Sequence, residues 1–189
     1  MNRTDVTLPK PKPVTLDPRK SALLVLDIGQ RWGTDPKLPC HQLAQKMTPF
    51  LRRAREVGML IIFTVAAYDR GTPNGRVYDI LERRPCEAVI FPDSFDKFTG
   101  GELGTLLRIY EVDTLVITGY RSNVAVLYTA TMAARNFSYR VVIPVDGIVT
   151  LKDYEQEYTL YQFTSFQPKI SERFLFTTLD GIHCTTNHK

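Results

Sequence analysis

Residues that bind metals or form disulfide frameworks are scarce in this chain. Its 189 residues include only three cysteines and three histidines. The cysteines are Cys40, Cys86 and Cys184, an odd number whose spacing matches no zinc motif. No apolar secretory segment precedes them. We therefore expect a protein of a reducing, cytoplasmic compartment, with no metal and no other cofactor.

Long apolar runs and a strong charge bias are also missing. No apolar stretch approaches the ~20 residues that a membrane-spanning helix needs, so we expect no membrane partner. The formal net charge is only +4 at pH 7, and Lys and Arg are spread along the chain. A basic stripe, which is the expected footprint of nucleic-acid binding, is not evident. The composition therefore favours a small-molecule substrate, with some preference for anions, and no nucleic acid.

The chain is long enough for one domain with a sizeable core. Residues 1–18 carry several prolines and charges of both signs, which predicts an extended N-terminal arm. Residues 19–189 show neither an internal repeat nor a low-complexity tract. We therefore expect a single domain over residues 19–189.

Short apolar runs alternate with amphipathic stretches along this domain. The predicted strands are residues 22–27, 59–65, 87–91, 113–118, 139–144 and 173–177. The predicted helices are residues 41–57, 101–110, 122–136 and 154–166, the first of them ended by Gly58. The strands are continuously apolar, as expected of strands buried on both faces. This order predicts an α/β fold of three layers (α/β/α), in which helices cover both faces of a six-stranded, Rossmann-like parallel sheet.

The ends of two predicted strands indicate where a site should lie. The first strand ends at Asp27, and the fourth leads through Gly119 into a helix that begins near Asn123. In the strand order 3-2-1-4-5-6 these two strands are neighbours where the order reverses, and ligands of open parallel sheets bind there. The helix start would add partial positive charge that suits an anion. Asp27 would then face Ala125 across a crevice; alternatively, its carboxylate only caps a nearby turn.

Other residues around this crevice allow more than one interpretation. Arg121 could bind an anionic substrate or pair with Asp27, or it could point to solvent or to a subunit interface. Ser122 or Asn123 is expected to be the N-cap of the helix. Ser122 is not expected to act as a nucleophile, because no histidine is placed to serve as its base. The turn-rich connection from Tyr68 to Pro85 either covers the site or is a surface excursion.

These motifs resemble those of the isochorismatase-like (cysteine hydrolase) family. Ser21–Gln30 resembles the family's strand-Asp-x-x-Gln start, and Phe98–Leu103 resembles its Phe-x-Gly-Thr-x-Leu segment. Ile117–Ala130 resembles its Thr-Gly-x-x-Thr-x-x-Cys-Val-x-x-Thr-Ala signature, and Asp146 after the fifth strand also fits. The match runs over about residues 20–180, and its order and spacing are specific. The resemblance implies the sheet described above and assembly into homo-oligomers, as dimers or larger.

The resemblance also implies a catalytic triad of Asp, Lys and Cys, in which the thiolate attacks an amide or carbamoyl carbon. Only the Asp is present at its expected place, as Asp27. The cysteine position is Ala125, and the lysine position, six residues before Phe98, is Pro92. Lys97 directly precedes Phe98 and would have to substitute from another place in the loop; otherwise it is a solvated lysine.

Two further features of the site follow from the resemblance. A non-proline cis peptide is expected between Tyr120 and Arg121. Zinc of the nicotinamidase type is not expected, because the loop Ala66–Asp69 contains no histidine. The candidate substrate-binding residues are Gln30, Trp32, Tyr68, Tyr120, Arg121, Ser122 and Asn123.

Three functions fit this sequence. The first is a hydrolase of a small, anionic metabolite that uses Asp27 as general acid/base without a cysteine, as in the branch of the family that protonates a vinyl ether. The second is a degenerate member that binds a small molecule or a partner protein without turnover. A crevice filled by Phe91, Tyr68 or Trp32 would favour it. The third is an amidohydrolase whose cysteine was exchanged for alanine, which Pro92 makes less attractive. The fold does not name a substrate.

Overall fold

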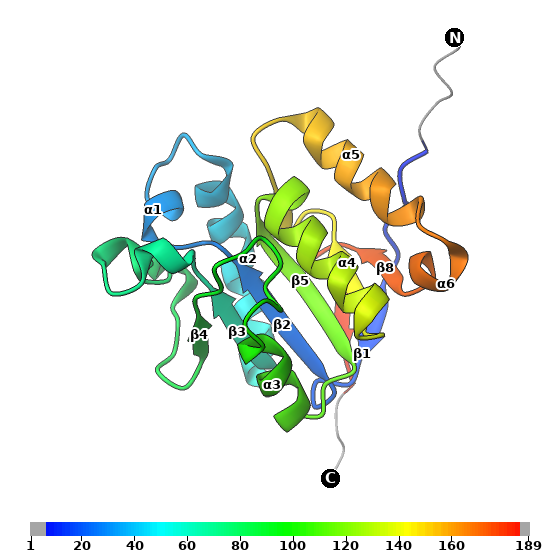
Figure 1. Ribbon diagram of the computed structural model, residues 1–189, viewed down its shortest axis with the longest axis horizontal. Helices are drawn as coiled ribbons and strands as arrows, with labels where there is room; N and C mark the ends of the chain where they lie inside the picture. The colour runs from blue at the N-terminus through cyan, green and yellow to red at the C-terminus, as the bar shows by residue number, and fades with distance from the viewer. Residues whose placement is uncertain (1–6, 186–189) are drawn as a thin grey trace.

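A parallel sheet forms the centre of the molecule. The computed structural model describes residues 7–185 (Figure 1). The strands run in the order β4-β3-β2-β5-β6-β8, which confirms the predicted order 3-2-1-4-5-6. Their bounds are β2 Ser21–Leu26, β3 Leu60–Thr64, β4 Ala88–Ile90, β5 Thr114–Tyr120, β6 Arg140–Pro144 and β8 Phe174–Thr177. All neighbouring strands on this path pair in parallel.

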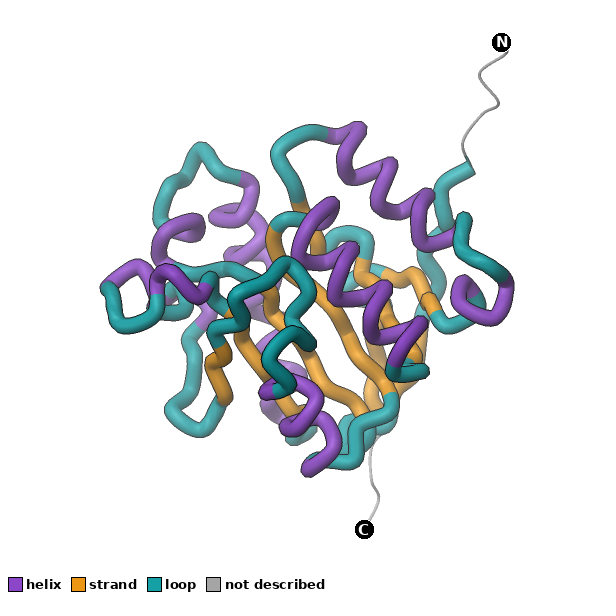
Figure 2. Tube along the Cα trace, in the orientation of Figure 1, coloured by secondary structure: helices purple, strands orange, loops and turns teal. Residues whose placement is uncertain are grey.

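Helices cover both faces of the sheet, which confirms the three-layer architecture. The helices are α1 Gln30–Gly33, α2 Pro39–Glu56, α3 Glu102–Ile109, α4 Leu127–Asn136, α5 Asp153–Thr164 and α6 Pro168–Ser171. In Figure 1, α3, α4 and α5 lie in front of the sheet and α2 lies behind it. The coloured trace of Figure 2 shows how strands and helices alternate along the chain.

Alternating side chains of the central strand belong to two separate cores. Leu23 and Val25 pack in the cluster that includes the apolar face of α2. Leu24 and Leu26 pack in the cluster on the opposite face, under α3 and α4. All six residues of β2 are buried, which is why the strand reads as a continuous apolar run. Gly58 follows the end of α2 with φ of 72°, as expected of a glycine that ends a helix.

The predicted helix over residues 122–136 consists of two parts. Ser122–Val126 forms a single π-helical turn, and the α-helix α4 begins only at Leu127. The turn is wider than an α-helical turn because its hydrogen bonds span five residues. Apolar spacing does not distinguish such a turn from the first turn of an α-helix. The predicted helix therefore begins at the correct residue, 122, but its first turn is π-helical and not α-helical as predicted.

Part of the predicted N-terminal arm is a strand. β1, Val14–Leu16, pairs in parallel with β9, Ile182–Cys184. Leu16 is buried at 2% exposure. The two strands are separated by most of the chain and contain three residues each, so no local pattern indicates that they pair. Residues 1–6 of the predicted arm lie outside the described residues.

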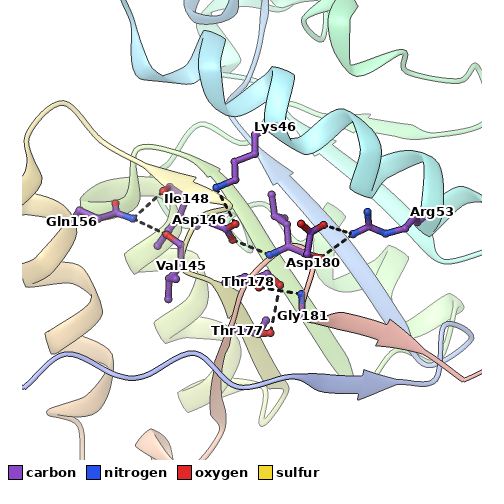
Figure 3. Close-up of polar contacts among 11 residues, drawn as sticks. Lys46, Arg53, Val145, Asp146, Ile148, Gln156, Thr177, Thr178, Asp180 and Gly181 are labelled. Carbon is purple, nitrogen blue, oxygen red and sulfur yellow. Dashed lines mark hydrogen bonds and ion pairs between the residues drawn. The ribbon is translucent and has the colours of Figure 1, made fainter.

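A polar network fixes the turn that follows β6 (Figure 3). Asp146 accepts a hydrogen bond from the Leu179 amide at 2.8 Å and pairs with Lys46 at 2.9 Å. The Gln156 side-chain amide donates to the carbonyl oxygens of Val145 at 3.3 Å and Ile148 at 2.9 Å. The turn leads into β7, Ile148–Val149, which pairs with the last two residues of β5. The network therefore positions the end of β5, where the candidate site begins.

We expect Gly119→Ala to disrupt the junction between β2 and β5. Gly119 has φ of 128°, and a Cβ there would lie 2.2 Å from the carbonyl oxygen of Leu26. Since the obstructing atom belongs to the backbone of the neighbouring strand, the free energy of unfolding should fall by at least about 3 kcal/mol in urea denaturation. Gly104→Ala is the matched control, because a Cβ there would meet only Phe98 Cδ1 at 3.9 Å. An equal loss in both variants would contradict this assignment.

Candidate active site

A cavity of about 640 Å³ opens beyond the carboxyl ends of β2, β3 and β5, as expected of an open parallel sheet. Asp27 and Ala125 both line it. The full set of lining residues is Asp27, Trp32, Ala66, Ala67, Tyr68, Pro92, Asp93, Ser94, Phe95, Lys97, Tyr120, Arg121, Val124 and Ala125. The cavity thus combines two acidic groups, two basic groups and several aromatic rings in one place.

Asp27 is held firmly at the end of β2. Its amide donates to the Thr64 carbonyl oxygen at 3.0 Å, and its Oδ1 accepts a hydrogen bond from the Thr64 hydroxyl at 2.8 Å. Its φ is 55°, a left-handed conformation that turns the chain sharply away from the strand. The side chain is only 18% exposed. Its second carboxylate oxygen, Oδ2, is directed to a cation and does not cap a turn.

That cation is Lys97, whose Nζ lies 2.7 Å from Asp27 Oδ2. The Lys97 side chain is only 3% exposed, so it is not a solvated lysine. Its Nζ also donates to the Ser94 carbonyl oxygen at 3.1 Å, and its amide donates to the Thr129 hydroxyl on α4 at 3.1 Å. Pro92, at the position where the family motif has lysine, lines the same cavity. The loop therefore brings an ammonium to Asp27 from a backbone position five residues further along the chain.

The Asp27–Lys97 pair concentrates charge in a sheltered place. Ion pairs removed from water interact more strongly than surface pairs, but each partner depends on the other to offset its desolvation. The Thr64 hydroxyl and the Lys97 ammonium both stabilise negative charge on the Asp27 carboxylate. The arrangement is suited to moving a proton between Asp27 and a bound molecule.

Ala125 occupies the wall of the cavity at the family's cysteine position. It is 2% exposed and lies within the π-helical turn Ser122–Val126. The amides of Val124 and Val126 both donate to the Arg121 carbonyl oxygen, at 3.1 and 3.2 Å. The site therefore offers a methyl group, and no thiol, close to the Asp27–Lys97 pair.

Arg121 forms a further part of the wall. The peptide bond between Tyr120 and Arg121 is cis, as the resemblance predicted. Arg121 Nη2 lies 3.6 Å from Glu155 Oε1 on α5, so the guanidinium pairs with Glu155 and not with Asp27. Its Nε is buried and has no hydrogen-bond partner among residues 7–185. The rest of the Arg121 side chain is 35% exposed and lines the cavity.

The aromatic residues shape the cavity without filling it. The rings of Trp32 and Tyr120 lie 5.9 Å apart, and Tyr120 is 6% exposed. Burial raises the pKa of the Tyr120 phenol, which keeps it neutral and able to donate a hydrogen bond. Tyr68 is 68% exposed at the rim, beneath the guanidinium of Arg31 at 5.4 Å. Phe91 is not a lining residue; the Arg70 guanidinium lies 4.9 Å from its ring centre.

Three candidate binding residues lie outside the lining of the cavity. Gln30 begins α1, and Ser122 is completely buried with no hydrogen-bond partner for its hydroxyl in the described part of the chain. Asn123 accepts a hydrogen bond from the Thr150 hydroxyl at 2.9 Å. The predicted N-cap is wrong, since Arg121 holds that position and no side chain caps the turn. A π-helical start shifts these side chains relative to an α-helical one.

Sequence reasoning missed three contributors. Asp93 and Phe95 line the cavity, and Glu155 holds Arg121 from α5. Asp93 and Phe95 precede Lys97 in a loop without periodicity. Glu155 belongs to a helix whose position over the site depends on the path of the preceding loop. In the sequence, Asp93 could have been noticed only because it is a charged residue next to Pro92.

The residues at the family's zinc loop do not suit a metal. Ala66 and Ala67 line the cavity there and offer no side-chain ligand. Within residues 7–185, no three His, Cys, Asp or Glu side chains gather in a way that could hold a metal ion. In the same range, no helix is both long enough and apolar enough to cross a membrane.

The parallel sheet with a cavity at its switch point defines an open, three-layer α/β domain. Residues 21–171 match the isochorismatase domain family, and the chain belongs to that family, whose members are hydrolases. A search of curated proteins finds no match.

Solved structures support the same fold. An isochorismatase family protein from Burkholderia thailandensis superposes with a TM-score of 0.75 at 22% identity, covering 90% of this chain and 96% of that one. A cysteine hydrolase from Pseudomonas syringae pv. phaseolicola gives 0.73 at 17% identity, covering 90% and 94%. The nicotinamidase from Staphylococcus aureus gives 0.67 at 22% identity, covering 77% and 92%.

Proposed function

We propose that this chain hydrolyses a small, anionic metabolite with Asp27 as general acid/base and without a cysteine nucleophile. The observation that carries this proposal is the 2.7 Å contact between Lys97 Nζ and Asp27 Oδ2 in the wall of the cavity. A buried ammonium paired with a carboxylate in a cavity is typical of a functional site, so the Lys97–Asp27 pair supports a role for Asp27 in turnover.

In the proposed reaction, water takes the place of the thiol. A water molecule beside the Ala125 methyl gives a proton to the Asp27 carboxylate while its oxygen attacks the scissile carbon. Asp27 then passes that proton to the leaving group. Lys97 remains protonated and stabilises the charge of Asp27 throughout. The guanidinium of Arg121, which lines the cavity, binds the anionic group of the substrate.

A degenerate member that binds without turnover is the second candidate. The absence of a nucleophile at Ala125 favours it. The filled crevice that would have favoured it further is not seen, because Trp32 and Tyr68 line a cavity of about 640 Å³ and Phe91 is not among its lining residues. The anionic character of the substrate, homo-oligomeric assembly and a cytoplasmic setting stay predictions.

Asp27→Asn is the direct test of the proposed function. The amide keeps the size of the side chain but cannot take up a proton, so turnover should fall by about 100-fold or more. Initial rates would be measured on a panel of small carboxylate-bearing amides, carbamoyl compounds and vinyl ethers. Substrate binding, followed by calorimetry, should persist.

Asp93→Asn is the matched control. Asp93 lines the same cavity but makes no hydrogen bond or ion pair within residues 7–185. We expect its turnover to stay within about threefold of the native chain, an effect below 1 kcal/mol. Equal turnover in Asp27→Asn and the native chain would remove Asp27 from the mechanism. Binding by the native chain with no turnover on any substrate would favour the second candidate.

A further inference from the structure

Among the side chains that line this cavity, the amine of Lys97 is the strongest nucleophile once it has lost a proton. With alanine at position 125, no thiol lines the cavity. The amine of Lys97 is 3% exposed and lies in the cavity wall. Among the described residues its Nζ contacts only Asp27 Oδ2 and the Ser94 carbonyl oxygen. One of its three positions is therefore left without a protein acceptor.

The carboxylate of Asp27 is placed to accept a proton from the ammonium of Lys97. An ammonium must lose a proton before its nitrogen can attack, and Asp27 Oδ2 is 2.7 Å away. Lysines that form Schiff bases with carbonyl compounds attack as neutral amines, so a group that takes the proton from the ammonium is required. The Trp32 and Tyr120 rings line the same cavity.

From this juxtaposition we propose that Lys97 forms a reversible imine with a small 2-oxo acid bound in the cavity. This activity goes beyond hydrolysis and does not depend on it. The carbonyl carbon reacts with Nζ, and the carboxylate of the acid binds the guanidinium of Arg121, which lines the cavity and is 35% exposed. A simple ketone or aldehyde lacks that second anchor.

The reaction balances without an oxidant, a reductant or a third component. Asp27 takes one proton from the Lys97 ammonium, and the neutral nitrogen forms a bond to the carbonyl carbon while the C=O π bond opens. One of the two protons left on the nitrogen moves to the oxygen, giving a carbinolamine. Asp27 returns the proton to the carbinolamine hydroxyl. The C–O bond breaks, water leaves, and the C=N bond of the imine remains. Hydrolysis of the imine is the reverse sequence, so the acid is released unchanged.

Borohydride trapping tests this proposal on the full chain. The protein is incubated with pyruvate or phenylpyruvate and sodium cyanoborohydride, which reduces an imine to a stable secondary amine. We expect intact mass to rise by the mass of the acid less one oxygen, with peptide mapping locating the adduct on Lys97. Phenylacetone, which matches phenylpyruvate but lacks the carboxylate, should be trapped at least about tenfold more slowly.

Variants separate the named roles. Lys97→Arg keeps the positive charge beside Asp27 but cannot form this imine, so the adduct should vanish while circular dichroism shows a folded chain. Lys46→Arg, at a lysine paired with Asp146 outside the cavity, should leave trapping unchanged. Arg121→Gln should lower the preference for phenylpyruvate over phenylacetone about tenfold.

Three results would overturn the proposal: no adduct with either acid, adducts spread evenly over exposed lysines, or an undiminished adduct in Lys97→Arg. Any of these leaves the hydrolase proposal intact, since hydrolysis is assayed without borohydride. Conversely, trapping at Lys97 in a chain that hydrolyses nothing would establish the imine chemistry alone.

Discussion

Ala125→Cys should introduce a thiol that is alkylated about 100-fold faster than the native exposed cysteine. The new sulfur would enter the wall that Ala125 forms, in the cavity that holds Asp27 and Lys97. A carboxylate that accepts the thiol proton and a nearby ammonium both favour the reactive thiolate. The factor of about 100 is the lower end of what a positioned general base contributes.

The measurement has an internal standard. Cys86 is exposed and free, so one alkylation time course with iodoacetamide at pH 7, read by peptide mass spectrometry, compares both thiols in the same molecule. If the Ala125→Cys variant also gains amide hydrolysis, Ala125→Ser is the control, because serine is similar in size but has no thiol. If the introduced thiol reacts no faster than Cys86, the cavity lacks the activating geometry.

Removing Asp27 should destabilise the fold far more than removing both members of the pair. Asp27→Ala leaves the Lys97 ammonium in a position that is 3% exposed. Leaving one buried charge without its partner costs about 3–5 kcal/mol of the free energy of unfolding. Lys97→Met should cost less, because Asp27 retains some exposure and the Thr64 hydroxyl.

The double variant Asp27→Ala/Lys97→Met should recover most of the loss, since it buries no charge. Urea denaturation of the four proteins gives the coupling energy of the pair. The surface pair Lys20–Glu111, at 2.8 Å with both side chains well exposed, provides the comparison and should show no comparable coupling. Additive effects of Asp27→Ala and Lys97→Met would mean that the two charges do not interact in solution.

The sequence was sufficient for the parts of the fold that depend on regular burial. Continuous apolar runs predicted the six strands, and their alternation with amphipathic helices predicted a parallel sheet between helices, whereas the strand order came from the family resemblance. Strand β1 was not predictable, because three residues pair with a partner near the other end of the chain. The π-helical turn at Ser122–Val126 was missed because its side-chain pattern is that of an α-helix.

For the candidate site, topology was more informative than local pattern. The switch point predicted that Asp27 and Ala125 share one crevice, and both line the cavity. The predicted role of Ser122 or Asn123 as N-cap was wrong, because it depended on the type of the first helical turn. The partner of Arg121 was missed, because the approach of α5 depends on a loop whose path the sequence does not specify.

The position of Lys97 bears on how such sites change over evolutionary time. An ammonium ends a chain of four methylene groups, so many backbone positions in one loop can deliver it to a single point. A cysteine sulfur is bonded directly to Cβ and has no such latitude. Here the ammonium of Lys97 reaches Asp27 although its backbone position is five residues beyond Pro92. One loop can therefore deliver an ammonium to a given point from several backbone positions, whereas a thiol must start from one.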